Sequence, residues 1–322
     1  MKQVPIIDLK PYVSGLDKAC VADQVDCACR EVGFLLIKNH GLSETLIRDT
    51  ERVSFTFFEQ PLEEKMLAAR PRPGVLRGYV PVSAESLSRS LGVNGEGDLN
   101  ESFMIGDPKP KSDPYYLKDE AGSHFLPNIW PERPKEFRQI WTEYFEAVSD
   151  LATTLMRVFA LALDLPEDYF DDKIDRHTGR LRVRYYPPIG ENTARSQMRA
   201  GAHTDYGSLT ILKPEAGRGG LQVCTKEGQW VDVPDVPGAF VINIGDLMAR
   251  WTNDRWVSTL HRVIIPEDGG AERRQSLAFF HQPNWSALIE TLPVCLAPGE
   301  SPKYAGVRSG PYLMSKFRST AM

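Results

Sequence analysis

Three residues of this chain have the types and spacing of a metal site. His203 and Asp205 form a His-x-Asp pair in the stretch GAHTDYGSLTIL, and His261 follows in STLHRVII. Two imidazoles and one carboxylate can occupy one face of an octahedral ion and leave the opposite face open, as in non-haem Fe(II) oxygenases, which bind dioxygen and a cosubstrate there. The residue types therefore predict a 2-His-1-carboxylate iron site.

The spacing of these residues limits the folds that could join them. In an extended strand, residues two apart project to the same side, so one short strand end could supply both His203 and Asp205. His261 lies 56 positions after Asp205, so the chain has to run away and return. Antiparallel strands packed into a jelly roll would bring it back.

Chance is the alternative explanation for the His-x-Asp pair, because the chain has six histidines and such pairs often lie on protein surfaces. A second motif argues against chance. Arg274 and Ser276 stand in RRQSLAFFHQPN, and Arg274 follows His261 by thirteen residues. A guanidinium and a hydroxyl two residues apart on a strand can hold a carboxylate from one side, with the arginine binding it bidentately. The triad followed by this pair predicts a cosubstrate that carries a carboxylate.

Six segments resemble the isopenicillin N synthase-like family of non-haem Fe(II)/2-oxoglutarate-dependent dioxygenases. They are VPIIDL, GFLLIKNHG, GAHTDYGSLTIL, VINIGDLMARWTNDRWVSTLHRV, RRQSLAFFHQPN and GPYLMSKF, so the resemblance covers nearly the whole chain. It implies a mixed α/β protein with a mainly β core. The expected core is a distorted double-stranded β-helix, or jelly roll, flanked by helices and preceded by an N-terminal α/β region.

The resemblance also implies roles for the motif residues. The two histidines and the aspartate would bind Fe(II), while Arg274 and Ser276 would hold the distal carboxylate of 2-oxoglutarate. Tyr186, in LRVRYYPP, stands where relatives place a tyrosine hydroxyl on the same cosubstrate. Asn243 and Asp246 belong to the NIGD turn, which we expect to shape the barrel rather than to bind iron. Asp246 is the rival carboxylate, but its turn setting and its family position argue against iron binding.

Two features depart from the family pattern. Arg184 stands two residues before Tyr186, where many relatives carry asparagine; it could face the substrate or form a structural ion pair. An insertion, EDGGAE, lengthens the segment between His261 and Arg274, and its two glycines predict a hairpin loop.

The reaction implied by the resemblance is the oxidation of a C–H bond of a small molecule by O2, with 2-oxoglutarate released as succinate and CO2. Hydroxylation is the default outcome, and desaturation or ring closure would use the same residues. Asp205 disfavours halogenation, because such halogenases replace this carboxylate with a small residue. Two alternatives stay open: an Fe(II) oxidase or oxygenase of this family that works without 2-oxoglutarate, and a non-catalytic metal-binding jelly roll.

The identity of the prime substrate does not follow from these motifs. Candidate pocket residues combine aromatic with polar groups, which suggests a partly apolar molecule with a polar or anionic handle. These candidates are Arg184, Phe103, Phe280 and Gln282. Phe103 fits a loop anchor equally well, and we interpret three neighbours in the same loops as anchors: Tyr79, Ser86 and Glu101. A C-terminal helix around GPYLMSKF is expected to close over the pocket.

Hydrophobic periodicity predicts the elements around the site. Helices are expected over residues 17–31, from Ser43 to just before Pro61, and over about 134–163. From residue 181 onward, seven or eight short β-rich runs predict the jelly roll. We expect an N-terminal dioxygenase domain over residues 1–128, a helical support over 129–178, the jelly-roll core over 179–284 and a closing segment over 285–322.

Composition favours a cytoplasmic enzyme that acts on a small molecule, and the family resemblance implies a role in secondary metabolism. The net charge is −5 and no basic run is present, which disfavours nucleic-acid and membrane partners. No obligate protein partner is evident. The five cysteines do not form paired CxxC sets, so reduced thiols are expected rather than a disulfide framework.

Overall fold

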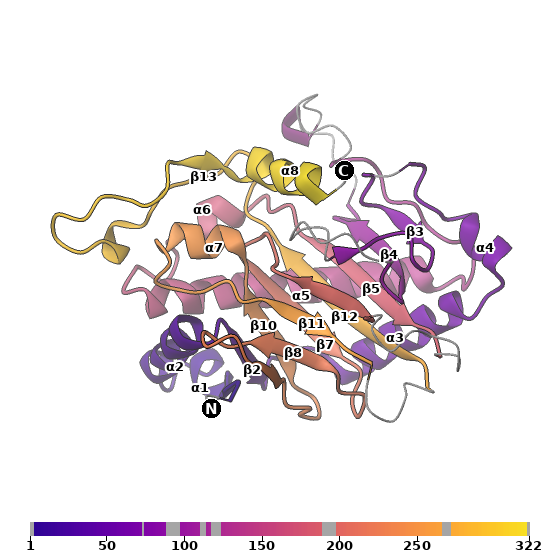
Figure 1. The fold of residues 1–322 in the computed structure, drawn as a ribbon, viewed down its shortest axis with the longest axis horizontal. Coiled ribbons are helices and arrows are strands. Elements are labelled where there is room, and N and C mark those ends of the chain that lie inside the picture. Colours follow the sequence, from indigo (N-terminus) through magenta and orange to yellow (C-terminus); the bar gives the residue numbers. More distant parts are fainter. Residues whose placement is uncertain are drawn as a thin grey trace.

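The computed structural model describes residues 3–72, 74–87, 97–109, 114–116, 124–188, 198–265 and 272–320. Its centre is an eight-stranded sheet in the order β1-β2-β10-β7-β12-β5-β4-β3 (Figure 1). The strands of this sheet are, in that order, Ile6–Asp8, Phe34–Lys38, Phe240–Ile244, Leu209–Pro214, Arg274–His281, Arg180–Tyr186, Glu101–Gly106 and Gly78–Val80. All neighbours pair antiparallel except β1 and β2.

A four-stranded sheet, in the order β6-β11-β8-β9, packs against the large sheet. Its strands are Ala200–His203, His261–Val263, Leu221–Cys224 and Trp230–Asp232. Apolar side chains from both sheets form one buried cluster, which includes Phe34 and Val241 from the large sheet and Val223 and Val263 from the small one. The two sheets form the double-stranded β-helix that the sequence predicted.

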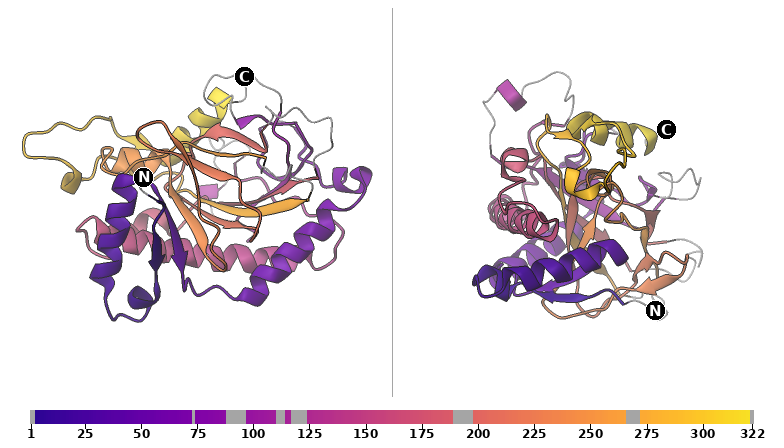
Figure 2. Two further views of the ribbon diagram at one scale, coloured as in Figure 1. Left: turned by 60° about the horizontal axis from the view of Figure 1, so that its bottom comes forward. Right: turned by 90° about the vertical axis from the view of Figure 1, so that its left-hand side faces the viewer.

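Three helices cover the outer face of the large sheet, and Figure 2 shows the long α5 running along it. They are α2 (Lys18–Glu31), α3 (Glu44–Phe58) and α5 (Phe137–Ala162). Two predicted starts are confirmed, since the side chains of Asp17 and Ser43 accept hydrogen bonds from the backbone N–H of Cys20 (3.0 Å) and Leu46 (3.4 Å). These helices bury the outward-facing side chains of the sheet in the main hydrophobic core.

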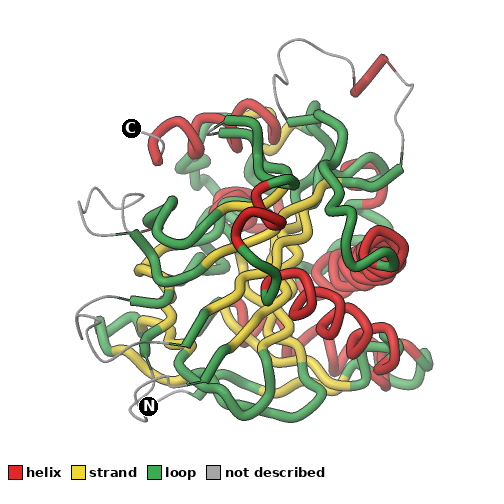
Figure 3. Tube along the Cα trace, turned by 90° about the vertical axis from the view of Figure 1, so that its right-hand side faces the viewer, coloured by secondary structure: helices red, strands yellow, loops and turns green. Residues whose placement is uncertain are grey.

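The C-terminal helix α8 (Ser309–Thr320) lies at the top of the molecule in the view of Figure 1, whereas α5 runs behind the strands. Figure 3 shows α8 from the side, next to the marked C-terminus. The remaining short elements are α1 (Lys10–Val13), α4 (Leu62–Met66), η2 (Pro114–Tyr116), α6 (Asp171–Ile174), α7 (Asp246–Trp251), β13 (Leu288–Ile289), η4 (Pro293–Cys295) and β14 (Val307–Arg308). The hairpin predicted at EDGGAE covers residues 267–272, of which all but the last lie outside the described residues. The domain limits remain a prediction.

The prediction that Phe103 lines the substrate pocket is wrong. Phe103 pairs with Val183 in the β4–β5 register and therefore shares the helix-facing side of the sheet. Its ring is completely buried against Phe57, Phe137 and Trp141, at centroid distances of 5.1, 5.2 and 5.3 Å. Residue types alone did not show which face of β4 meets the helices.

Glu101 and Tyr79 are the anchors that we expected. The Glu101 carboxylate lies on the same face of β4, where it accepts hydrogen bonds from Lys65 Nζ (2.7 Å) and from the hydroxyl of Tyr79. All three side chains are buried. This group joins α4 to the edge of the sheet and does not reach the barrel interior.

Gln282, another candidate for substrate contact, has a structural hydrogen bond, and its contact with substrate stays a prediction. Its side chain is 1% exposed, and its Nε2 donates to the hydroxyl of Ser309 at 2.7 Å. Ser309 is the first residue of α8. Gln282 therefore uses its amide to attach the C-terminal helix to the end of β12.

Replacing Phe103 with alanine is expected to lower the free energy of unfolding by about 3–5 kcal/mol, because it empties a fully buried aromatic site. Substrate preference of the folded fraction should not change. Denaturant unfolding and a comparison of relative rates on several substrates would check both points. An altered substrate preference without lost stability would contradict the position described for this ring.

No helix in the described ranges combines the length and the apolar character needed to cross a membrane. All five cysteines lie in the described part of the chain and are free thiols.

Candidate metal centre and cosubstrate site

Strand pairing places the two histidines of the sequence motif side by side. His203 ends β6, His261 begins β11, and the two residues are direct partners in the antiparallel register. Asp205 follows in the turn to β7. A Cβ at Gly207 would overlap the backbone carbonyl of His281, so a glycine lets this turn lie directly on β12.

The ligand atoms of the three residues converge on one point. The Nε2 atoms of His203 and His261 lie 3.9 and 4.0 Å from Oδ1 of Asp205, and the two imidazole rings are 4.2 Å apart. One ligand atom from each residue lies within 4.8 Å of the other two. These separations leave room for one ion at bond lengths of roughly 2.0–2.2 Å. No other group of three such residues was found in the described part of the chain.

Hydrogen bonds orient each ligand atom toward that point. Nδ1 of His203 lies 2.8 Å from the carbonyl oxygen of Gly201, and Nδ1 of His261 lies 3.1 Å from that of Thr259. A carbonyl oxygen only accepts, so both Nδ1 atoms carry the proton and both Nε2 atoms keep a free lone pair. The histidines have the tautomer that metal binding requires.

The carboxylate of Asp205 is held in the same way. Its Oδ2 accepts hydrogen bonds from Thr210 Oγ1 (2.6 Å) and Asn243 Nδ2 (2.8 Å), which leaves Oδ1 facing the histidines. Thr210 and Asn243 are cross-strand partners on β7 and β10. The large sheet therefore positions the carboxylate, and the small sheet positions the imidazoles.

The electrostatic setting keeps the donors ready to bind a cation. Burial, together with the neighbouring His261, lowers the pKa of His203 to about 3. Burial acts to raise the pKa of Asp205, but the two histidines and the hydrogen bonds from Thr210 and Asn243 bring it below its ordinary value. Near neutral pH this gives a neutral His203 and an ionised Asp205.

Arg274 indicates which kind of cosubstrate the barrel could bind beside the metal. It pairs with Tyr186 across β12 and β5, and its guanidinium carbon lies 5.3 Å from the centre of the Tyr186 ring. The side chain is 2% exposed, yet its Nε and Nη1 have no hydrogen-bond partner among the described residues. Buried donors are nearly always satisfied, so these two N–H groups fit the distal carboxylate of a small dicarboxylic acid.

Ser276 and Arg184 lie at the next inward-facing positions. They are partners in the β12–β5 register, and Phe280 lies four residues beyond Ser276 on the same face of β12. Arg184 is buried and donates from Nη1 to Asn100 Oδ1 at 3.2 Å. Its charge also contributes to the lowered pKa of His203. Phe280 is half-buried on this face, and its contact with substrate stays a prediction.

The sequence analysis missed the positioning roles of Thr210 and Asn243. We interpreted Asn243 as a residue that shapes the barrel, and we did not single out Thr210. Both stand at inward positions of predicted strands, and this alternation was the available signal. Which inward residue reaches the aspartate depends on the pairing of β7 with β10, which one sequence does not show.

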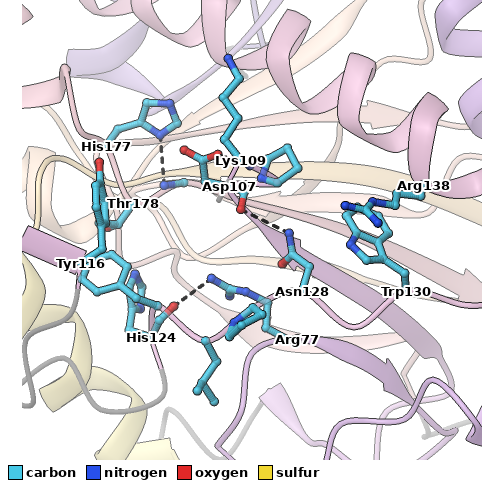
Figure 4. A pocket seen from close by; sticks show the side chains of 15 residues that line it. Arg77, Asp107, Lys109, Tyr116, His124, Asn128, Trp130, Arg138, His177 and Thr178 are labelled. Atoms are coloured by element: carbon cyan, nitrogen blue, oxygen red, sulfur yellow. Dashed lines mark hydrogen bonds between the residues drawn. The ribbon is translucent and has the colours of Figure 1, made fainter. Parts of the chain in front are cut away.

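A separate cavity of about 520 Å³ lies beside the ends of β4 and β5 (Figure 4). Arg77, His124, Trp130 and Arg138 are among its lining residues. None of the triad residues and none of the Arg274 group line it. This cavity is therefore distinct from the candidate metal centre.

Replacing Asn243 with alanine, or Thr210 with valine, is expected to weaken metal binding by roughly 10–100-fold, because each change removes a hydrogen bond that orients Asp205. Anaerobic titration with Fe(II) measures the dissociation constant. Thr178→Val is a matched control, since that buried hydroxyl donates to the carbonyl of Pro283. Equal affinity in all four proteins would refute the orienting role.

Both the N-terminal and the C-terminal part of the chain match models of known protein families. Residues 4–133 match the family model described as non-haem dioxygenase in morphine synthesis N-terminal, and residues 178–283 match that of the 2OG-Fe(II) oxygenase superfamily. The chain is 35% identical over 306 residues to the 2-oxoglutarate-Fe(II) type oxidoreductase hxnY of Emericella nidulans, covering 93% of this chain and 85% of that protein. It is 32% identical over 330 residues to homoarginine-6-hydroxylase 2-ODD-233 of Oryza sativa, covering 98% and 96%.

A solved structure gives a similar result. The crystal structure of a full-length Neurospora crassa protein in complex with alpha-KG and thymine matches with a TM-score of 0.86 and 30% identity. The match covers 98% of this chain and 97% of that one.

Proposed function

Because the chain belongs to the 2OG-Fe(II) oxygenase superfamily, we propose that His203, Asp205 and His261 are the residues that bind its Fe(II). The protein is a non-haem Fe(II)- and 2-oxoglutarate-dependent dioxygenase that oxidises a C–H bond of a small molecule. Bound iron and 2-oxoglutarate supply the oxidising chemistry, in which O2 is consumed and 2-oxoglutarate becomes succinate and CO2.

We propose that Arg274, Ser276 and Tyr186 hold 2-oxoglutarate. The observation that carries this proposal is the buried guanidinium of Arg274, which has two N–H groups without a partner among the described residues, inside the same barrel as the triad. A planar guanidinium matches a carboxylate in charge and in hydrogen-bond geometry. Ser276 lies on the same face of β12, and Tyr186 faces Arg274 across the strand pair.

Different residues of the barrel would hold the metal and the far end of the cosubstrate. Arg274 fixes the distal end of the cosubstrate, and the oriented ligands fix the metal. The apolar residues that join the two sheets lie beside this site and limit the access of bulk water. The prime substrate is left to approach from the side of Phe280 and α8.

Hydroxylation is the proposed outcome, because one of the relatives named above is a hydroxylase and the other is an oxidoreductase of the 2-oxoglutarate-Fe(II) type. We also propose a cytoplasmic enzyme of secondary metabolism. The free cysteines support the first point, and the N-terminal match to a family described by morphine synthesis supports the second.

A substrate screen scored by succinate release tests this function. The anaerobically loaded enzyme is started with oxygen, and succinate is compared with oxidised product. One succinate per product is expected. Product without succinate would instead support the oxidase alternative that does not use 2-oxoglutarate. No Fe(II)- and 2-oxoglutarate-dependent turnover with or without substrate would support the non-catalytic alternative.

A further inference from the structure

A second buried arginine inside the barrel has unsatisfied N–H groups. Arg180 begins β5 and is 6% exposed, and its Nε and Nη1 have no hydrogen-bond partner among the described residues. Arg182 and Arg184, on the same face of β5, each have a side-chain acceptor. Arg182 donates from Nη2 to Glu85 (2.6 Å), although its Nε has no partner among the described residues, and Arg184 donates from Nη1 to Asn100 (3.2 Å). Burying a charge without a counter-ion is costly, so Arg180 needs an explanation that Arg182, which is paired with Glu85, does not.

The strand registers place Arg180 in line with the residues that hold Asp205. Asn243 pairs with Thr210, Thr210 with Phe280, and Phe280 with Arg180. This row crosses the inner face of the sheet, and Asp205 is hydrogen-bonded to its first two members. Two strand spacings separate Thr210 from Arg180, which is roughly 10 Å. Phe280 lies between them.

Two aromatic rings also link Arg180 to the metal centre: one lies on α8, and the other follows Asp205 in the turn to β7. The guanidinium carbon of Arg180 lies 4.7 Å from the centre of the Phe317 ring on α8. Phe317 in turn lies edge to face against Tyr206, at 5.6 Å between centroids, and Tyr206 directly follows Asp205. The space between the metal centre and Arg180 is therefore bordered by Phe280, Phe317 and Tyr206.

The charged side chains nearest to Arg180 are themselves arginines, so the local charge is positive. Burial, and then Arg77 and Arg182, lower the pKa of Arg180 to about 9, with no carboxylate of the described residues acting in the opposite direction. Arg77 packs on Gly106, the β4 partner of Arg180, where a Cβ would overlap its guanidinium. The carboxylate of Glu85 is the acidic group that pairs with an arginine on this face of β5, but it is already shared by Arg182 and Arg70. Arg180 therefore stays protonated at neutral pH in a setting that favours an anion.

We propose that Arg180 binds a carboxylate of the prime substrate and so orients the C–H bond to be oxidised over Phe280, toward the metal centre. This inference rests on the proposed function. The guanidinium geometry favours a planar anion, and the aromatic border favours an apolar or aromatic body. The substrate class is thus a compact carboxylic acid whose oxidised carbon lies within roughly 10 Å of its carboxylate.

The test uses matched acids and amides as probes. Benzoate, phenylacetate, 3-phenylpropionate and hexanoate, each beside its primary amide, are titrated anaerobically into the enzyme loaded with Fe(II) and 2-oxoglutarate, and calorimetry gives Kd. At least one acid is expected to bind about 10-fold more tightly than its amide, the advantage of one charge-assisted hydrogen-bonded pair. Arg180→Gln should abolish this difference, and Arg180→Lys should keep part of it.

Arg138→Gln is the matched control. Arg138 is an exposed arginine that lines the separate cavity of Figure 4, so its loss should leave the acid preference unchanged. Acids that bind no better than amides, or an acid preference that persists in Arg180→Gln, would overturn the role of Arg180. Failure of the wild type to bind 2-oxoglutarate in an Fe(II)-dependent way would instead overturn the proposed function.

A stability measurement separates substrate binding from a structural role. Arg180→Met removes a buried charge and keeps a long side chain, so it should raise the Tm of the substrate-free protein by roughly 2 °C. A residue kept for structure would give a lower Tm when replaced. A fall in Tm would therefore count against the proposal even if the variant lost acid binding.

Discussion

Replacing Asp205 with alanine is expected to reduce 2-oxoglutarate-dependent turnover by at least about 1,000-fold, which corresponds to about 4 kcal/mol of lost transition-state stabilisation. The change removes the anionic donor, whose Oδ1 lies about equally far from both histidine Nε2 atoms. It also leaves Thr210 and Asn243 without their shared acceptor. Initial rates of succinate formation, with metal content measured in the same samples, check this result.

Asp246→Asn is the matched control for that loss. Asp246 is the first residue of α7, directly after β10, and is the rival carboxylate of the sequence analysis. Its oxygens accept from Ser258 Oγ (2.7 Å) and Lys316 Nζ (2.8 Å), so they tie α7 to α8 and do not face the histidines. We expect the variant to keep its metal. Lost metal in Asp246→Asn, with metal retained in Asp205→Ala, would reverse the assignment.

Replacing Arg274 with glutamine is expected to raise the KM for 2-oxoglutarate by roughly 10–100-fold, because a hydrogen bond to a charged group contributes about 1.5–3 kcal/mol. The metal site should remain loaded. The loss should depend on the distal carboxylate, so 2-oxopentanoate, which lacks that group, should be used equally poorly by the wild type and the variant. Steady-state kinetics with both 2-oxo acids measure the difference.

The neighbouring arginine provides the control. Arg273 is exposed, pairs with Glu59 at 2.9 Å and stacks on Phe55 outside the barrel. Arg273→Gln should leave the KM for 2-oxoglutarate unchanged. If both variants raised this KM equally, or if the KM for 2-oxopentanoate rose as much as that for 2-oxoglutarate in Arg274→Gln, Arg274 would not hold the distal carboxylate.

The chemistry of the site could be predicted because its residues stand close together in the sequence, in pairs with a characteristic spacing. His203 and Asp205 are two residues apart, and so are Arg274 and Ser276, and an extended strand projects such pairs to one side. The barrel then brings the pairs together, as the direct pairing of His203 with His261 and of Arg274 with Tyr186 illustrates. The start of α3 followed from Ser43, which caps that helix as predicted.

The substrate side was predicted less well, because it depends on which face of each strand meets the helices. Phe103 and Glu101 were predicted near the substrate or as anchors, and the β4–β5 register directs both toward the helices. The hydrogen bond from Gln282 to Ser309 could not be predicted, because the two residues are 27 positions apart. Arg180 was overlooked although Arg180, Arg182 and Arg184 alternate along one strand. Its unsatisfied N–H groups became visible only in three dimensions.

The most direct test of the central claim is the weak visible absorption band that forms when 2-oxoglutarate chelates Fe(II) in the absence of oxygen. The wild-type protein should develop this band at one equivalent of iron and of 2-oxoglutarate. His203→Ala and Asp205→Ala should lose it, while Asp246→Asn keeps it. A band that persisted unchanged in both ligand variants would show that iron and 2-oxoglutarate bind elsewhere in the protein.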